Sequence, residues 1–232
     1  DATPVTDTRR GYLQQLGETG LANWAAEHNT SLRLLVRPGH YVFPGAPIAV
    51  MMPPVEGADA AIRNATALGP QRVSSADLEF AVRQLVEVAV RALSPGVNDP
   101  HTAMSVLDRL GAGLCDIVPL HLPNGVHLRD DRVALMVPAI QYDGLLDAMF
   151  HMIRQAAASD AAVLIRMLEV LTSVVSSERD HLRMGSLQRH ANLVVGAARR
   201  NVHMPQDLAD VERRYLAFVT MREDGPLGQF RS

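Results

Sequence analysis

The sequence predicts an α+β fold: a small N-terminal β barrel- or sandwich-like module, followed by a mainly helical bundle with an inserted β-hairpin. Two observations predict it. Short alternating runs, punctuated by glycine and proline, fill residues 11–52. Apolar residues at helical spacing dominate most of the chain after residue 77. With 232 residues, 47% of them hydrophobic and 20% charged, the chain is long and apolar enough to bury a substantial core.

Composition excludes several classes of function. The net charge is −3 without a basic block, so no nucleic-acid partner is expected. The 22 basic residues are all arginine, which excludes chemistry that needs a lysine amine, and no cofactor is expected. Cys115 is the single cysteine; it rules out an intrachain disulfide and suits a reducing compartment. Its place in an apolar helical pattern predicts a buried, unreactive thiol.

Residues 1–10 are polar and predict a linker, and residues 11–55 predict the small β module. Strands are expected at residues 11–16 and 32–36, with a short helix at 21–28 between them. Glycines are expected to form tight turns in the segment that follows. There, the spacing Gly39, Val42, Gly45, Ile48 resembles the turns of biotinyl- and lipoyl-type domains, although no lysine is present to carry a cofactor.

Residues 56–222 predict the helical domain, and residues 223–232 a tail. A linker or short helix at 58–68 precedes a strong amphipathic helix, capped by Ser74 or Ser75, that ends near Leu93. The next helix is expected to begin at Pro100, with Asp99 as its N-cap, and to end near residue 118. A hairpin then occupies residues 122–137. Further helices are expected at residues 143–158, 160–185, 187–201 and 207–221.

The stretch from Arg91 to Ala103 joins two predicted helices and is the candidate functional site. One reading is a well-capped αα-corner, built from residue types that form turns and caps. The other is a site for a small anionic ligand at the start of the second helix. The side chains of Arg83, Gln84 and Arg91 are expected to hold the loop of residues 94–102 in place. The candidate residues are Arg83, Arg91, Ser94, Asn98, Asp99, His101 and Thr102.

Other candidate sites are weaker. An enzyme, for example a hydrolase that uses Asp99 and His101 as an acid–base pair, is the alternative function, although the sequence offers it neither a nucleophile nor a metal. The histidines lack ligand spacing, so no zinc site is expected. Asp180, His181 and His190 do not share a helix face and are expected on a solvated helix surface.

Residues 92–103, Ala-Leu-Ser-Pro-Gly-Val-Asn-Asp-Pro-His-Thr-Ala, resemble the signature of a bacterial family of predicted membrane proteins, domain of unknown function 2254. Supporting pieces are Gly11-Tyr12-Leu13-Gln14, the segment from Arg37 to Val42, and Arg72 with Asp77 ahead of the motif. The resemblance implies several transmembrane helices N-terminal to this chain.

That resemblance sets the functional expectation. The chain is expected to be the soluble, cytoplasmic part of an inner-membrane protein, with an assembly, regulatory or ligand-sensing role rather than an enzymatic one. Its partners would be the protein's own transmembrane region and, given the broad apolar helix faces, a second copy of the chain.

Overall fold

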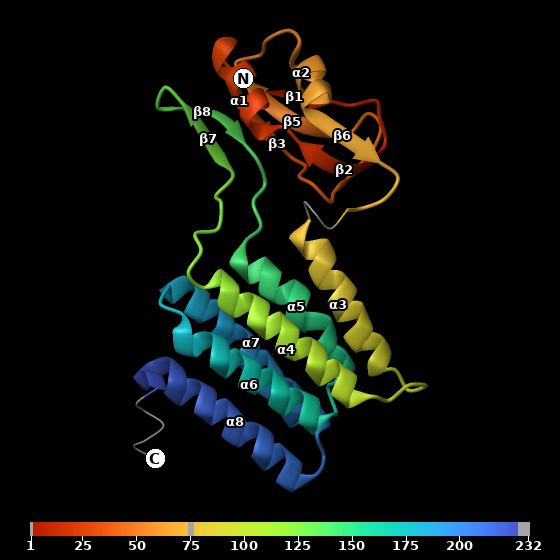
Figure 1. Ribbon diagram of the computed structural model, residues 1–232, viewed down its shortest axis with the longest axis vertical. Coiled ribbons are helices and arrows are strands. Elements are labelled where there is room, and N and C mark those ends of the chain that lie inside the picture. Colours follow the sequence, from red (N-terminus) through yellow and green to blue (C-terminus); the bar gives the residue numbers. More distant parts are fainter. Residues whose placement is uncertain (1, 74–76, 227–232) are drawn as a thin grey trace. The chain divides into compact units, whose positions relative to one another are not determined.

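The computed structural model describes residues 2–73 and 77–226. The chain forms two compact units: a β unit of residues 1–81 and 122–140, and a helical unit of residues 82–121 and 141–232. Sheets at the N-terminal end followed by helices confirm the predicted α+β class (Figure 1). The expected cap at Ser74 or Ser75 lies outside the described residues.

The β unit contains two sheets. The first has the order β1–β5–β3–β8–β7, and only its β3–β8 pair is parallel. Its strands are β1 (Thr3–Thr6), β5 (Pro47–Met52), β3 (Ser31–Leu34), β8 (Arg132–Met136) and β7 (Val126–Arg129). The second sheet is antiparallel, with the order β4 (Tyr41–Val42), β2 (Gly11–Leu16) and β6 (Thr66–Gly69). The predicted hairpin thus completes a sheet that the N-terminal strands begin.

Helices α1 (Glu18–Glu27) and α2 (Ala58–Ala65) share the core of the β unit with the strands. The strands alternate as a half-buried sheet requires: Leu32 and Leu34 of β3 are buried, whereas Arg33 between them is exposed. Leu21 of α1 and Ile62 of α2 pack into the same core. The alternation that predicted these strands therefore reports which side chains are buried.

Two expectations for this part of the chain differ from the structure. Residues 1–10 are not only a linker, because Thr3–Thr6 pair with β5 and bury Val5. The β unit also extends beyond residue 55, since it takes in α2, β6 and the hairpin. Short polar strands at a sheet edge have too little periodicity to be recognised alone. Gly39 and Gly45 do take positive φ, 93° and 80°, as their expected turns require.

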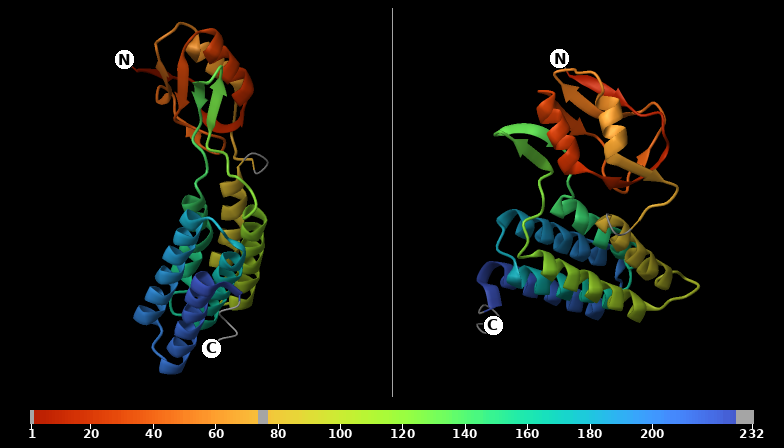
Figure 2. Two further views of the ribbon diagram at one scale, coloured as in Figure 1. Left: turned by 90° about the vertical axis from the view of Figure 1, so that its left-hand side faces the viewer. Right: turned by 45° about the horizontal axis from the view of Figure 1, so that its top comes forward.

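The helical unit is built around α6, which contacts α4, α7 and α8, while α5 packs on α7 (Figures 1 and 2). Because three helices surround it, α6 buries apolar residues over most of its circumference. The helices of this unit are α3 (Leu78–Ala92), α4 (Pro100–Ile117), α5 (Tyr142–Ala156), α6 (Ala161–Ser177), α7 (His181–Asn201) and α8 (Pro205–Asp224). The first four residues of α3 belong to the β unit.

One predicted helix boundary was wrong. The helix expected at residues 160–185 ends at Ser177, and α7 begins at His181, so Gly185 lies inside α7. The break depends on acidic side chains rather than on glycine or proline. Glu178 Oε1 accepts hydrogen bonds from the backbone N–H groups of Arg179 and Asp180, and Asp180 caps α7 by accepting from Leu182 N at 2.8 Å.

Two single-residue expectations were also wrong. Cys115 is exposed, because Leu114 beside it faces the core of the helical unit and Cys115 points away from that core. His190 was expected on a solvated surface, but it is completely buried in α7, where its ring lies 5.7 Å from that of Phe150. A single histidine on the apolar face of a helix leaves the spacing of the apolar residues unchanged, so the spacing does not reveal that it is buried.

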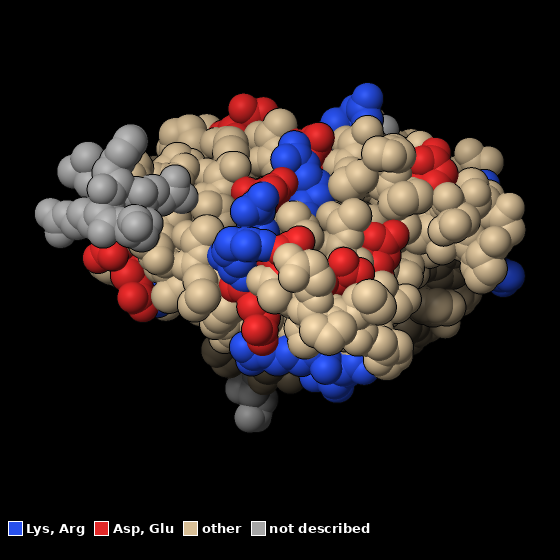
Figure 3. All heavy atoms as spheres, turned by 90° about the horizontal axis from the view of Figure 1, so that it is seen from below, with Lys and Arg blue, Asp and Glu red and all other residues tan. Residues whose placement is uncertain are grey.

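Ion pairs connect the outer faces of the helices. Arg166 of α6 contacts Asp108 of α4 at 2.6 Å and Glu169 at 3.0 Å, and Arg214 of α8 reaches Glu169 at 2.9 Å. Figure 3 shows arginine and acidic side chains gathered together on one face of the molecule. Exposed pairs of this kind each contribute little stability, but they neutralise one another's charge.

Candidate functional site

The corner between α3 and α4 closes on its own backbone. The N–H groups of Val97 and Asn98 both donate to Ser94 O, at 3.0 and 2.9 Å, and Asp99 N donates to Ala92 O at 2.8 Å. Asn98 adopts a φ of 50°, a left-handed conformation that asparagine tolerates better than most residues. Five residues of the signature thus have a local structural task.

Asp99 is the N-cap of α4, as the sequence predicts. Its Oδ1 accepts from Thr102 N at 3.1 Å, and its Oδ2 accepts from the Thr102 hydroxyl at 2.6 Å. Pro100 follows as the first helical residue. The Thr102 hydrogen bonds lower the pKa of Asp99, because they stabilise its ionised form.

Replacing Asp99 with alanine is expected to lower the thermal unfolding midpoint of the helical unit by a few degrees, because Thr102 N loses its cap. Asp99→Asn should keep an unfolding midpoint close to that of the wild type, since an amide oxygen still accepts from Thr102. Asp116→Ala, which removes an exposed acid from the other end of α4, is the matched control. Equal melting of Asp99→Ala and the control in a circular-dichroism melt would contradict a capping role.

Of the other predicted site residues, Thr102 contacts Asp99, whereas Arg83, Arg91 and His101 do not gather around it. Among the described residues, the exposed His101 ring makes no hydrogen bond, and both Asp99 oxygens are engaged by Thr102. The hydrolase alternative therefore finds no second catalytic group here. Arg83 is exposed, and the Arg91 guanidinium contacts Glu87 at 2.5 Å.

The expected clamp on the loop also differs from what the structure places there. Gln84 is exposed like its neighbour Arg83, and neither side chain hydrogen-bonds the loop within the part of the chain that is described. Only the backbone carbonyl of Arg91 does so, by accepting from the Ser94 hydroxyl at 2.7 Å. The Arg91 side chain pairs along its own helix with Glu87 instead.

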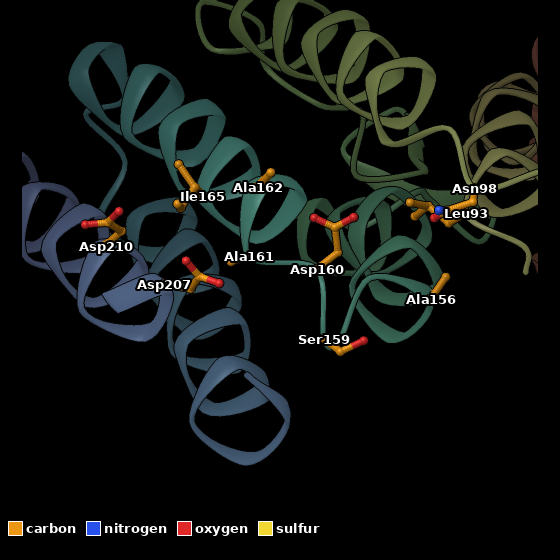
Figure 4. A pocket seen from close by; sticks show the side chains of 10 residues that line it. All are labelled: Leu93, Asn98, Ala156, Ser159, Asp160, Ala161, Ala162, Ile165, Asp207 and Asp210. Carbon is orange, nitrogen blue, oxygen red and sulfur yellow. The ribbon is translucent and has the colours of Figure 1, made fainter. Parts of the chain in front are cut away.

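A pocket of about 570 Å³ lies beside the corner. Figure 4 shows Asn98 and Leu93 at one end, Asp207 and Asp210 of α8 at the other, and Asp160 between them. The remaining lining residues are Ala156, Ser159, Ala161, Ala162 and Ile165. The sequence indicated Asn98 for this site, but not the carboxylates, which come from loops and helices more than 60 positions away.

The described lining of this pocket contains three carboxylates and no basic side chain. Two of them have local tasks: Asp160 caps α6 by accepting from Val163 N at 3.1 Å, and Asp210 pairs with Arg213. Asp207 lies in the first turn of α8, where negative charge is favourable. The resulting negative potential favours a cationic ligand over the small anion expected from the sequence.

A second cluster brings together residues that the sequence left apart. Asp77 is buried, and its carboxylate accepts from Arg72 Nε at 2.8 Å and Nη2 at 2.5 Å. Its other oxygen accepts from Phe80 N at 3.0 Å, the contact of an N-cap at the start of α3. The Arg72 guanidinium also lies 5.3 Å from the centre of the Phe80 ring.

The turn at Gly39 completes this cluster. A Cβ on Gly39 would overlap the Asp77 carboxylate and lie 2.9 Å from Arg72 Nη2, so both the space and the positive φ require glycine. Beside it, Arg37 pairs with Glu79 at 2.6 Å. Burial, assisted by the Arg37 charge, lowers the pKa of His40. These groups satisfy one another, so the cluster holds the first turn of α3, which itself belongs to the β unit.

Comparisons with known proteins give the same picture as the motif. The family model described as "Predicted membrane protein (DUF2254)" matches residues 1–173. Uncharacterized proteins of Mycobacterium tuberculosis (strains CDC 1551 and H37Rv) and Mycobacterium bovis are 30% identical over 219 residues, which is 91% of this chain. The chain spans 42% of the length of these relatives.

No solved structure matches the chain. Within the described residues, no helix combines the length and the apolar character that crossing a membrane requires. The family match covers the β unit, the signature corner and most of α6. The chain therefore belongs to the DUF2254 family of predicted membrane proteins.

Proposed function

We propose that this chain is a regulatory, ligand-sensing part of an integral inner-membrane protein, and that it faces the cytoplasm. The family description supports the membrane attachment. The relatives are more than twice as long as the matched region, which leaves them ample length for other parts. A single cysteine in the whole sequence suits the reducing side of the membrane.

The corner pocket is the observation that carries the sensing role. The family signature contributes Asn98 to a cavity large enough for a small molecule, and three carboxylates line the same cavity. Among the described residues, no three ligating side chains are grouped to hold a metal ion. Three carboxylates spaced along one cavity suit an organic cation with several N–H donors, of the polyamine class.

The connection of α3 gives such a ligand a route of influence. Asn98 lies just beyond the C-terminal end of α3, and Asp77 and Glu79 hold its N-terminal end to the β unit. A ligand that orders the corner would thus act on a helix whose other end is fixed by buried charges. This is a mechanical link through one continuous helix, and it predicts that the Asp77 cluster is required for any response beyond binding.

Binding is tested by calorimetry and thermal melts of the chain with spermidine as the probe, and with Mg²⁺ for comparison. Spermidine should raise the unfolding midpoint with saturation. Asn98→Gly keeps the left-handed backbone but removes the amide, and Asp207→Asn removes one charge. Each is expected to weaken spermidine binding by about tenfold, the effect of one charged hydrogen bond. Asp116→Asn, an exposed acid elsewhere on the helical unit, should bind like the wild type.

Two results would contradict the sensing proposal. One is the absence of a saturable response to either cation, and the other is an equal response in wild type and both pocket variants. The membrane attachment has its own test. The full-length protein should sediment with the membrane fraction, and an epitope after residue 232 should be cleaved by protease only in inside-out vesicles. Protection in inside-out vesicles would place the chain on the opposite side.

A further inference from the structure

Among the described residues, Arg154 is a buried cation without a counter-charge. It lies in the last turn of α5 and is 9% exposed, and its buried Nε has no hydrogen-bond partner in that part of the chain. In the parts of the chain that the structure describes, no carboxylate pairs with it, in contrast to Arg166, Arg189 and Arg214 nearby on the helical unit. An uncompensated buried charge is among the most costly features that a fold can retain.

A second arginine lies at the same end of the helix pair. Tyr142 stacks under Arg183 and Phe150 contacts His190, so α5 and α7 run in the same direction, and α7 continues about one turn beyond the end of α5. Arg200 occupies the last turn of α7 and is exposed, and its guanidinium folds back to 3.5 Å from where a Cβ on Gly196 would lie, which is the level of Arg154. Burial, and then the like charge of Arg200, lower the pKa of Arg154, as expected where two cations repel each other.

The helix ends do not resolve this repulsion. The carbonyl ends of α5 and α7 carry partial negative charge, which favours arginine there. However, no carbonyl among the described residues accepts a hydrogen bond from Arg154, and its Nε is shielded from water as well. An arginine that merely extended its head into solvent would keep all its nitrogens hydrated. Within the described chain, Arg154 thus has no partner for its charge.

We propose that Arg154 and Arg200 form a binding site for an anionic group, a phosphate or a carboxylate. Two guanidinium groups at the same end of the helix pair, one buried and one exposed, provide the N–H donors that such groups bind. The site is separate from the corner pocket, whose lining includes neither arginine. In a membrane protein the same chemistry is available from a free anion or from a phospholipid headgroup, and the experiment distinguishes these sources.

The chain and three variants are melted in rising sodium phosphate at constant ionic strength. Phosphate stabilises most folded proteins through exclusion from their surface, so the informative quantity is the difference between variants. Arg154→Gln and Arg200→Gln should each lose most of the saturable shift and bind phosphate about tenfold more weakly. Arg109→Gln removes an exposed arginine of α4 that has no acidic partner among the described residues, and it should respond like the wild type.

A second measurement does not depend on the choice of anion. Without phosphate, Arg154→Gln should melt at or above the wild-type temperature, because it removes an unpaired buried charge. A clear loss of melting temperature in that variant, with an unchanged phosphate shift, would show that Arg154 is a structural residue and would overturn the proposal.

Sedimentation with vesicles identifies the source of the anion. Binding to phosphatidylglycerol but not to phosphatidylcholine vesicles, lost in Arg154→Gln, would assign a lipid headgroup. A phosphate shift without vesicle binding would assign a free anion. A wild type that responds to neither overturns the site. Asn98→Gly should retain the phosphate response, so failure of the corner pocket and failure of this site are separable.

Discussion

Replacing Asp77 with alanine is expected to lower the free energy of unfolding of the β unit by about 3–5 kcal/mol, the range for breaking a buried ion pair from one side. The Asp77 side chain is 1% exposed and accepts from Arg72 and from Phe80 N. The substitution therefore leaves the largely buried Arg72 guanidinium without its counter-charge and removes the cap of α3 at the same time.

Asp59→Ala is the matched control, because it removes a carboxylate from the same unit. Asp59 is exposed and reaches Arg63 only at 3.4 Å, one helical turn away. Its loss should cost under about 1 kcal/mol. Denaturant titrations of Asp77→Ala, Arg72→Ala and the double variant give the coupling energy directly. A double variant that loses the sum of the two single losses would show that the pair is not coupled and would sink this prediction.

Local chemistry explains why the signature corner could be predicted residue by residue. The hydrogen bonds of the Asp99–Thr102 cap and of the loop to Ser94 each join residues three or four positions apart, and the Pro100 start is a property of a single residue. Turn and cap preferences encode contacts at that range. The turn at Gly39 was predictable for the same reason, since its positive φ is a local property.

Contacts between distant segments could not be predicted in this way. Arg37 and Glu79 pair across 42 positions, and nothing in their spacing indicates it. The parallel pairing of β3 with β8 joins Leu32 to Leu135 and depends on the topology of the whole chain. The edge strand at Thr3–Thr6 was missed because its partner β5 defines it, whereas its own composition is that of a linker.

The candidate site divides along the same line. The sequence indicated Asn98, but the carboxylates that share its pocket belong to α8 and to the cap of α6. Their role in the pocket follows from how the helices pack around α6, and each carboxylate has an ordinary local explanation in the sequence. The sequence alone favoured an anionic ligand, whereas the carboxylates that the packing brings to the pocket favour a cationic one.

His190 is expected to make the helical unit acid-sensitive. Burial, and then the charge of Arg189, lowers the pKa of His190 to about 4 in the folded protein, against about 6.5 in an unfolded chain. Asp147 lies 3.2 Å from its Nε2 and opposes this shift, but the same carboxylate oxygen is held by Arg189 at 2.8 Å. The unfolded chain thus binds more protons than the folded one between pH 4 and 6.5.

The sign of the pH dependence follows from that difference. The contribution of a neutral, buried His190 is fully present above about pH 6.5 and is lost as the pH falls toward 4. Its size is about 3 kcal/mol, from 1.36 kcal/mol for each unit of difference in pKa. Carboxylates will add to the acid loss, so urea titrations at pH 7 and pH 4.5 must be compared with those of His190→Leu, which cannot titrate at this position.

The loss of stability between the two pH values should shrink by about 2–3 kcal/mol in His190→Leu. His203→Gln, which removes an exposed histidine from the segment between α7 and α8, should keep the wild-type loss. If His190→Leu and the wild type lost equal stability, His190 would have to be charged in the folded unit, with Asp147 rather than burial setting its state. Because the ring has no solvent access, this pair of titrations decides whether burial keeps His190 neutral or Asp147 keeps it charged.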